Sequence, residues 1–318
     1  MRRLALGALA VLGALVVNSR STAADRTAVT LGTATPGGGF PVYGQAFAET
    51  IHATDPTLEI QQRNTKGSTE NVPLLELGEL DLALVQGEVA YEAIMGVGRA
   101  PADLRLLTAM YSTPGMFVVR ADSPYRSIAD LKGQPVAFGA RGSGLVILAR
   151  YVLDGIGLDQ HKDFQAIFLD AAGDGPTMVM DGRAAALWGG GIGWPGFGAV
   201  AQGPAGGRFI APAAAEIERI RAKHAFLKPL TIPAGSYPGQ DTAINSVGSW
   251  SFVMTRATLS GDVAYRLARA LHRGEADLAR RLPQARETSA ANTVAAVPRA
   301  NLIHPGVARY LREIGVLR

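Results

Sequence analysis

Two glycine-rich turns carry the residues whose types and spacing suit ligand chemistry. TATPGGGF (33–40) lies between an apolar run and a helical pattern, and FGARGSG (138–144) occupies the same place in a later stretch. The first N–H groups of a helix lack intrahelical partners and carry partial positive charge. Such a turn suits a carboxylate or phosphate, although glycines can also serve only to make a tight turn between a strand and a helix.

The second turn adds side chains that suit a carboxylate. Gly142 and Gly144 allow close approach of the backbone, Ser143 offers a hydroxyl, and Arg141 can pair with a carboxylate through two hydrogen bonds. The spacing G-x-x-G-x-G differs from both the dinucleotide-binding motif and the P-loop. We predict a carboxylate site at residues 141–144.

Signals for catalysis are weak in the rest of the chain. Ser143 does not lie in a G-x-S-x-G nucleophile elbow. Five histidines are scattered without the spacing of metal ligands: His52, His161, His224, His272 and His304. The chain has no cysteine, which excludes disulfides, thiolate metal sites and cysteine nucleophiles. We predict a protein that is not an enzyme, with no catalytic residue, no metal site and no cofactor.

The two turns need strands and helices that bring them together. Short apolar runs alternate with helical patterns, which favours an α/β fold with largely parallel sheets. Strands are expected at 28–32, 58–62, 81–86, 104–112, 116–120, 135–139, 165–170, 185–189 and 249–256. Helices are expected at 68–79, capped by Ser68, and at 144–157, 262–282 and 304–315. The order begins twice, so we predict two α/β lobes whose turns line one cleft.

Residues 1–24 have the layout of a secretory signal peptide. Arg2 and Arg3 precede an apolar run from Leu4 to Val17, and Ala24 ends a T-x-A cleavage signal. A membrane anchor is the alternative, but the run is shorter than the ~20 residues that a spanning helix needs. We predict export to the periplasm with cleavage near Ala24.

The charge balance gives no sign of a nucleic-acid partner. The whole chain has 31 basic and 27 acidic residues, and removal of residues 1–24 takes away three arginines and no acid. The mature chain is therefore almost neutral, without a run of one sign. Nucleic-acid binding needs a basic patch to neutralise phosphates, so we predict none.

Several segments together resemble the TAXI family, the solute-binding subunits of one class of TRAP transporters. They are TATPGGGF, KGSTENVPLLELGELDLALVQGEVAYEA (66–93), VVRADSPYRSIADLKGQPVAFGARGSG (118–144), TIPAGSYPGQD (231–241) and LIHPGVARYLREIG (302–315). The resemblance implies a two-lobe, type II periplasmic-binding-protein-like fold. It also implies a small organic anion, a carboxylate or an amino acid, bound between the lobes and delivered to a TRAP membrane permease.

The resemblance also sets the expected lobes and ligand contacts. Lobe one is expected at 25–125 and 247–318 and lobe two at 126–246, with crossings near 121–126 and 244–248, in a monomer. The expected contacts are Gly38, Gly39, Phe40, Tyr43, Gln86, Arg141, Gly142, Ser143, Gly144, Trp188 and Tyr237. Trp188 and Trp194 stand where the family more often has small aliphatic residues, and they either wall the pocket or pack in the core. The alternative function is an ABC-type or sensory solute-binding protein of the same fold.

Overall fold

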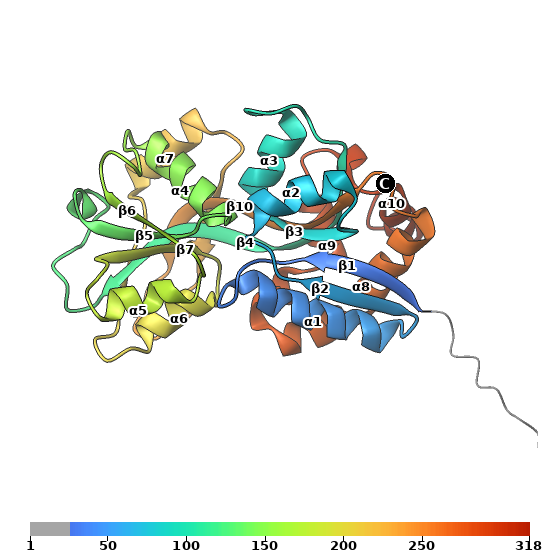
Figure 1. Cartoon of the computed structure of the whole chain (residues 1–318), viewed down its shortest axis with the longest axis horizontal. Helices are drawn as coiled ribbons and strands as arrows, with labels where there is room; N and C mark the ends of the chain where they lie inside the picture. The colour runs from blue at the N-terminus through green and yellow to red at the C-terminus, as the bar shows by residue number, and fades with distance from the viewer. Residues whose placement is uncertain (1–25) are drawn as a thin grey trace, which may run out of the picture.

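The computed structural model describes residues 26–318, which form two α/β halves lying side by side (Figure 1). The predicted signal peptide and its cleavage site lie outside the described residues. Within residues 26–318, no helix is long and apolar enough to cross a membrane. The same residues contain no group of three acidic or histidine side chains placed to hold a metal ion.

The first half is built on a sheet in the order β2-β1-β3-β10-β4. β1 (Thr27–Gly32) pairs in parallel with β2 (Leu58–Arg63) and β3 (Leu82–Gln86), whereas β10 (Ile244–Arg256) runs antiparallel to β3. One face packs against α1 (Gly39–Thr54), α8 (Gly261–Arg281) and α10 (Pro305–Glu313). The other face packs against α2 (Ser68–Leu77) and α3 (Gly87–Met95). Every residue of β3 is buried, as expected of a strand covered on both faces.

The second half repeats this arrangement in the middle of the chain. β5 (Pro135–Ala140) pairs in parallel with β6 (Gln165–Leu169) and β7 (Ala186–Gly190). β8 (Gly207–Ile210) runs antiparallel to β4 (Leu104–Arg120). The helices are α4 (Gly144–Gly155), α5 (Asp174–Met180), α6 (Pro195–Ala201) and α7 (Ala214–Lys223). The paired layout and two-lobe α/β fold predicted from the sequence are confirmed.

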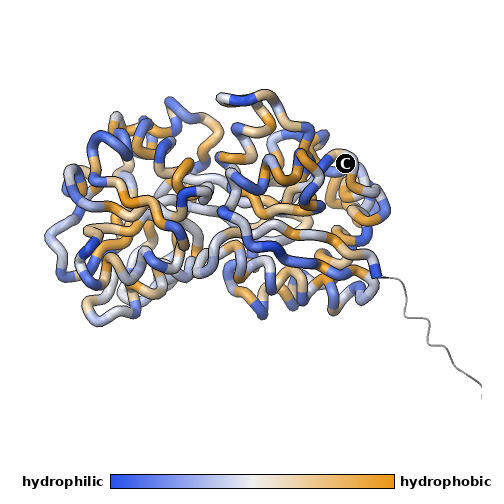
Figure 2. The backbone as a smooth tube through the Cα atoms, viewed as in Figure 1, coloured by the Kyte–Doolittle hydropathy of each residue, from blue (hydrophilic) through white to orange (hydrophobic). Residues whose placement is uncertain are grey.

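Each half has its own apolar core. In the first half, Phe47 and Ile51 of α1 and Leu271 of α8 lie in one buried cluster. In the second half, Phe117 packs edge-on against Trp188, with ring centroids 4.7 Å apart. Figure 2 shows hydrophobic segments gathered inside both halves and hydrophilic segments mainly at the periphery.

Two long strands connect the halves. β4 pairs with β10 up to Pro114 and with β7 from Gly115 onward, so it leaves one sheet and enters the other between these two residues. Glycine is needed on both strands at this point. A Cβ on Gly248 of β10 would lie 1.9 Å from the Thr113 carbonyl oxygen, and a Cβ on Gly115 of β4 would lie 2.6 Å from the Trp188 ring. β4 thus enters the second sheet before residues 121–126, and the expected crossings and lobe bounds stay predictions.

Several local expectations need correction. The runs 104–112 and 116–120 form one strand, β4, because Pro114 lies where the strand changes partners. Ser68 does not cap α2, whose cap is Gly67; the Ser68 hydroxyl instead accepts a hydrogen bond from the Gln86 N–H at 3.0 Å. β8 and β9 (Lys228–Ile232) were not expected, since they are short edge strands that contain glycine or proline. Three 3₁₀ helices and α9 complete the described chain: η1 (Ala129–Leu131), η2 (Pro283–Glu287), α9 (Ala290–Ala296) and η3 (Ala300–Leu302).

Candidate functional site

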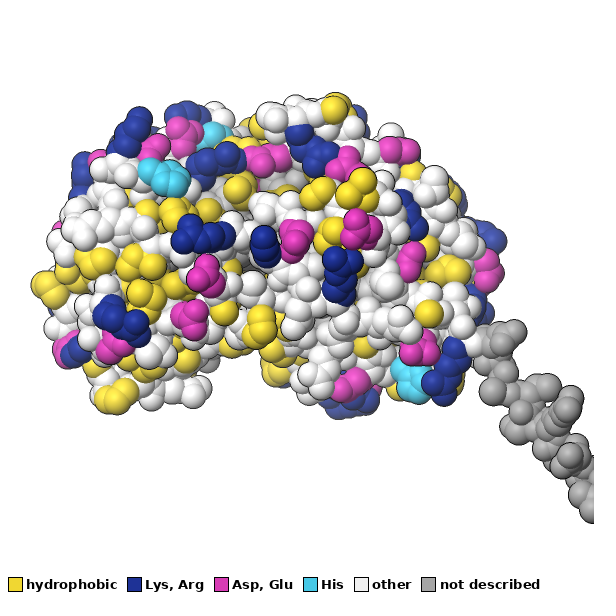
Figure 3. All heavy atoms as spheres, viewed as in Figure 1, with side chains coloured by type: hydrophobic (Ala, Val, Ile, Leu, Met, Phe, Trp, Pro, Cys, Tyr) yellow, Lys and Arg dark blue, Asp and Glu magenta, His cyan; other side chains and the backbone are white. Residues whose placement is uncertain are grey.

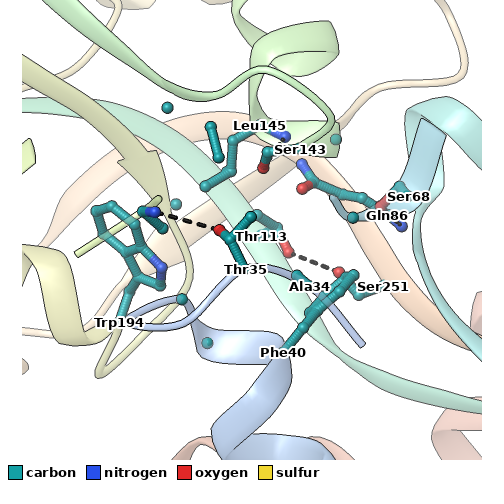
Figure 4. Close-up of a pocket in the computed structure, with 18 of the residues that line it drawn as sticks. Ala34, Thr35, Phe40, Ser68, Gln86, Thr113, Ser143, Leu145, Trp194 and Ser251 are labelled. Atoms are coloured by element: carbon teal, nitrogen blue, oxygen red, sulfur yellow. Dashed lines mark hydrogen bonds between the residues drawn. The ribbon is translucent and has the colours of Figure 1, made fainter. Parts of the chain in front are cut away.

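Four helices begin at one cavity between the two halves. α1, α2 and α3 follow β1, β2 and β3 in the first half, and α4 follows β5 in the second. The residues at their N-termini line the cavity: Gly38, Gly39, Gly67, Ser68, Gln86, Ser143 and Gly144. Its volume is about 50 Å³. We call it the helix-end cavity (Figure 4).

The helix-end cavity favours negative charge. The first N–H groups of each helix have no intrahelical acceptor, and the helix dipole places partial positive charge at that end. Among the described residues that line the cavity, Lys66 is the only charged side chain and there is no carboxylate. Charge elsewhere is mixed, and cationic and anionic side chains are interspersed on the face shown in Figure 3. The cavity is therefore an anion-favouring site in a nearly neutral molecule.

The two halves touch around the cavity. The Gly142 carbonyl accepts hydrogen bonds from the Thr69 N–H at 3.2 Å and the Thr69 hydroxyl at 3.0 Å. On another side, the Ala172 N–H donates to the Thr35 hydroxyl at 3.2 Å. A Cβ on Gly144 would lie 2.5 Å from the Gln86 Cβ, so glycine is needed for this approach. The structure is thus a closed arrangement of the halves, which explains the small volume.

Polar side chains add donors to the cavity wall. Gln86 is 3% exposed, and its Nε2 has no hydrogen-bond partner among the described residues. Figure 4 shows its amide group directed toward Ser143. At the floor, the hydroxyls of Thr113 on β4 and Ser251 on β10 lie 3.2 Å apart (Figure 4). These groups can donate to a ligand that enters from between the halves.

Aromatic rings form one wall of the cavity. Phe40, Tyr111 and Trp194 line it. Trp194 is held in place because its backbone N–H donates to the Tyr237 hydroxyl at 3.0 Å, and that hydroxyl donates to the Gly191 carbonyl at 2.5 Å. The wall gives apolar contact to the body of a ligand whose charged group faces the helix ends.

A buried acid lies behind Gln86. Glu88, in the first turn of α3, is fully buried, and neither of its carboxyl oxygens has a partner among the described residues. Loss of solvent raises the pKa of Glu88 to about 7, opposed by the neighbouring Ser249 and Gln86 side chains. The protonated form is neutral, so it does not repel an anion in the helix-end cavity.

Six of the predicted contacts line the helix-end cavity: Gly38, Gly39, Phe40, Gln86, Ser143 and Gly144. The cavity combines the two glycine turns from separate halves, as the sequence analysis expected. No ligand contact itself is observed, so these assignments stay predictions.

The structure places Arg141 outside this cavity. Its side chain is 69% exposed, and its Nε lies 3.6 Å from an Asp170 oxygen that is itself exposed. Gly142 lies beside it, and its carbonyl is occupied by Thr69. Of residues 141–144, only Ser143 and Gly144 line the helix-end cavity, and the carboxylate site expected at 141–144 stays a prediction.

Three predicted aromatic contacts are also absent from the lining. Tyr43 is fully buried within α1 and its hydroxyl lies 3.3 Å from that of Thr288. Trp188 is fully buried, with its Nε1 donating to the Leu145 carbonyl at 2.9 Å. Tyr237 lies behind the cavity wall, where its hydroxyl accepts a hydrogen bond from the Trp194 backbone. Of the two tryptophans, Trp188 packs in the core and Trp194 walls the cavity.

The sequence analysis missed several lining residues. Lys66 stands in KGS, directly before a helix start, and this position beside glycine was a usable signal. Thr113 and Ser251 lie inside the long connecting strands, where nothing in their local sequence distinguishes them from ordinary strand residues. Tyr111 likewise comes from the strand interior.

Comparison with solved structures identifies the class of fold. MatC from Rhodopseudomonas palustris, solved with bound malate, matches with a TM-score of 0.58 at 14% identity, over 91% of this chain and 96% of that chain. The alkanesulfonate-binding protein SsuA from Xanthomonas axonopodis pv. citri, bound to MOPS, matches with a TM-score of 0.52 at 18% identity, over 93% and 96%. A TctC solute-binding protein from Polaromonas matches at 0.50 and 17%, over 82% and 89%. The fold is that of periplasmic solute-binding proteins.

The family follows from the sequence match. Residues 31–315 match the NMT1-like family, and the chain belongs to that family.

Proposed function

We propose that this protein is an exported solute-binding subunit of a transporter, and that it captures a small organic anion in the helix-end cavity. The observation that carries the proposal is the convergence of four helix N-termini on one cavity whose only charged lining residue, within 26–318, is Lys66. Neighbours of the same fold include proteins solved with malate and with MOPS, both organic anions. A carboxylate or a sulfonate fits the same donors.

In this proposal, the anion enters while the halves are apart and closure buries it. Its charged group faces the N–H groups of Gly39, Ser68 and Gly144, with the Lys66 ammonium and the Gln86 amide beside it. Phe40 and Trp194 contact its apolar part. The ligand stabilises the closed form only through contacts it makes better there than in the open form. No bond is made or broken.

The lobes and partner follow the same proposal. We place the first hinge at Pro114–Gly115, where β4 passes from β10 to β7, and the second at Gly248, where β10 passes from pairing with β4 to pairing with β9. The TAXI resemblance favours a TRAP membrane permease as the receiver and the periplasm as the location. An ABC permease is the second candidate for the receiver.

The test is mass spectrometry of small molecules released by denaturing protein purified natively. A released carboxylate or sulfonate that rebinds with 1:1 stoichiometry supports the proposal. A neutral or cationic ligand, or turnover of the anion, contradicts it. Co-purification of the wild-type protein with its membrane partner then decides between TRAP and ABC permeases.

A further inference from the structure

A second and larger cavity lies against α3, separate from the helix-end cavity. It is bounded by α3, β10, the segment 295–302 and the residues before β9, and its volume is about 570 Å³. The two cavities share no lining residue. We call the second one the α3 groove. Figure 1 shows α3 at the boundary between the two halves, facing the side where α7 lies.

The walls of the α3 groove are mainly apolar. Ile94, Val297 and Leu302 line it, together with four aromatic residues, Tyr91, Phe226, Trp250 and Phe252. The Tyr91 and Phe226 rings stack with centroids 4.1 Å apart and planes within 8°. Since Tyr91 belongs to the first half and Phe226 packs against the core of the second, this stack closes one end of the groove across the boundary.

Two cations give the groove its polarity. Lys228 and Arg299 are exposed residues that line it, and no aspartate or glutamate does so among the described residues. Within residues 26–318, neither cation has an ion-pair partner. The Arg299 guanidinium instead lies 3.9 Å from the Met95 sulfur. An apolar cavity with two uncompensated cations is complementary to an anion with an apolar body.

We propose that the α3 groove is a second ligand site, for an amphipathic organic anion with an apolar body and one carboxylate or sulfonate. The volume lies within the roughly 300–1,000 Å³ typical of small-molecule sites. The apolar body lies on Phe252 and Trp250, and the charged group meets Arg299 beside Met95 at the end of α3. The site goes beyond capture of the transported solute, since it lies at a different place and its volume suits a larger apolar body.

The experiment is titration calorimetry of the mature protein with octanoate, and with octan-1-ol as the neutral compound of equal chain length. We expect one octanoate site with at least tenfold higher affinity than octan-1-ol. Arg299→Glu should lower the affinity for octanoate at least tenfold. Lys162→Glu, which reverses an exposed cation outside the groove, should leave it unchanged. Ala295→Trp, which fills the groove from an exposed position, should abolish binding while the circular dichroism spectrum stays native.

The outcomes against the proposal are distinct from failure of the proposed function. No heat with octanoate, equal affinity for octan-1-ol, or unaltered octanoate affinity in folded Arg299→Glu would each overturn the second site. Lys66→Ala, which removes the cation of the helix-end cavity and does not force the halves apart, should retain octanoate binding. Loss of octanoate binding in that variant would assign the binding to the helix-end cavity and overturn the second site. It would not contradict the proposed capture of an anion in the helix-end cavity.

Discussion

The helix-end cavity and the α3 groove differ in how they present charge. The first is small, about 50 Å³, and is lined by residues at four helix starts. The second is larger, about 570 Å³, and offers two flexible side-chain cations above apolar walls. Fixed backbone dipoles need little reordering when an anion binds, whereas lysine and arginine lose rotamer freedom. Donor arrangement, rather than volume, marks the primary anion site.

The two cavities also differ in their dependence on closure. The helix-end cavity is sealed by contacts such as Thr69 with Gly142, which join the halves directly. The α3 groove has a volume of about 570 Å³ in the same closed arrangement, in which the Tyr91–Phe226 stack crosses the boundary between the halves. Changes at a sealed contact should therefore affect the primary site far more than the groove.

The largest expected effect is at Gly144. In Gly144→Val the new side chain would meet the Gln86 Cβ at 2.5 Å and keep the halves apart. We expect affinity for the released anion to fall more than a hundredfold, measured by calorimetry. Gly261→Val is the matched control, because nothing lies within 4 Å of a Cβ there. Near wild-type affinity in Gly144→Val would show that the helix-end cavity is not the solute site.

The next effect concerns Glu88, which lies between the two cavities, beside Gln86 and Ser249. Its folded pKa of about 7 exceeds the model-compound value of 4.5, so the folded state holds a proton that the unfolded state releases between these pH values. This contribution to stability is complete below about pH 4.5 and is lost as pH rises through 7. Between pH 4.5 and pH 8, wild type should lose roughly 3 kcal/mol of unfolding free energy that Glu88→Gln keeps.

Urea unfolding at several pH values measures this difference. Glu218→Gln, on the exposed surface of α7, should follow wild type. If Glu88→Gln and wild type lose stability in parallel with rising pH, the carboxyl is not buried as described. Binding to the α3 groove should be unaffected by this variant, which separates the acid from the second site.

A smaller effect separates Lys66 from Arg141. Lys66→Ala should remove a charged hydrogen bond to the anion, worth about 1.5–3 kcal/mol, or roughly tenfold to hundredfold in affinity. Arg141→Ala should change affinity less than about twofold, since its exposed pairing with Asp170 contributes little. The reverse ranking would restore the carboxylate site predicted from the sequence and move it out of the helix-end cavity.

The smallest effect is expected at the floor of the helix-end cavity. Ser251→Ala removes one neutral donor beside Thr113 and should cost about 0.5–1.5 kcal/mol of binding free energy. Calorimetry should show a twofold to tenfold loss of affinity, and Thr231→Ala, on the exposed strand β9, should show none. An unchanged affinity would place the ligand away from the connecting strands.

The order of elements and the two glycine turns could be predicted from the sequence. Local patterns determine them: an apolar run followed by glycine and a periodic helix encodes a strand, a turn and a helix N-terminus within a few residues. The donors at Gly39 and Gly144 follow from that local pattern, since the N–H groups of a first helical turn have no intrahelical acceptor whatever the side chains are.

Only the tertiary structure decided which side chains accompany those donors. Arg141 and Gly144 are only three residues apart, yet Arg141 faces solvent and Gly144 faces Gln86. The turn into α4 directs the two Cα–Cβ positions to different sides. Trp188 and Trp194 were equivalent in sequence, and strand β7 buries the first while Tyr237 holds the second at the cavity. Thr113 and Ser251 meet only because β4 and β10 run antiparallel through the boundary. The direction of each side chain and the pairing of distant strands are set by packing between elements far apart in the chain. The local sequence does not encode this packing.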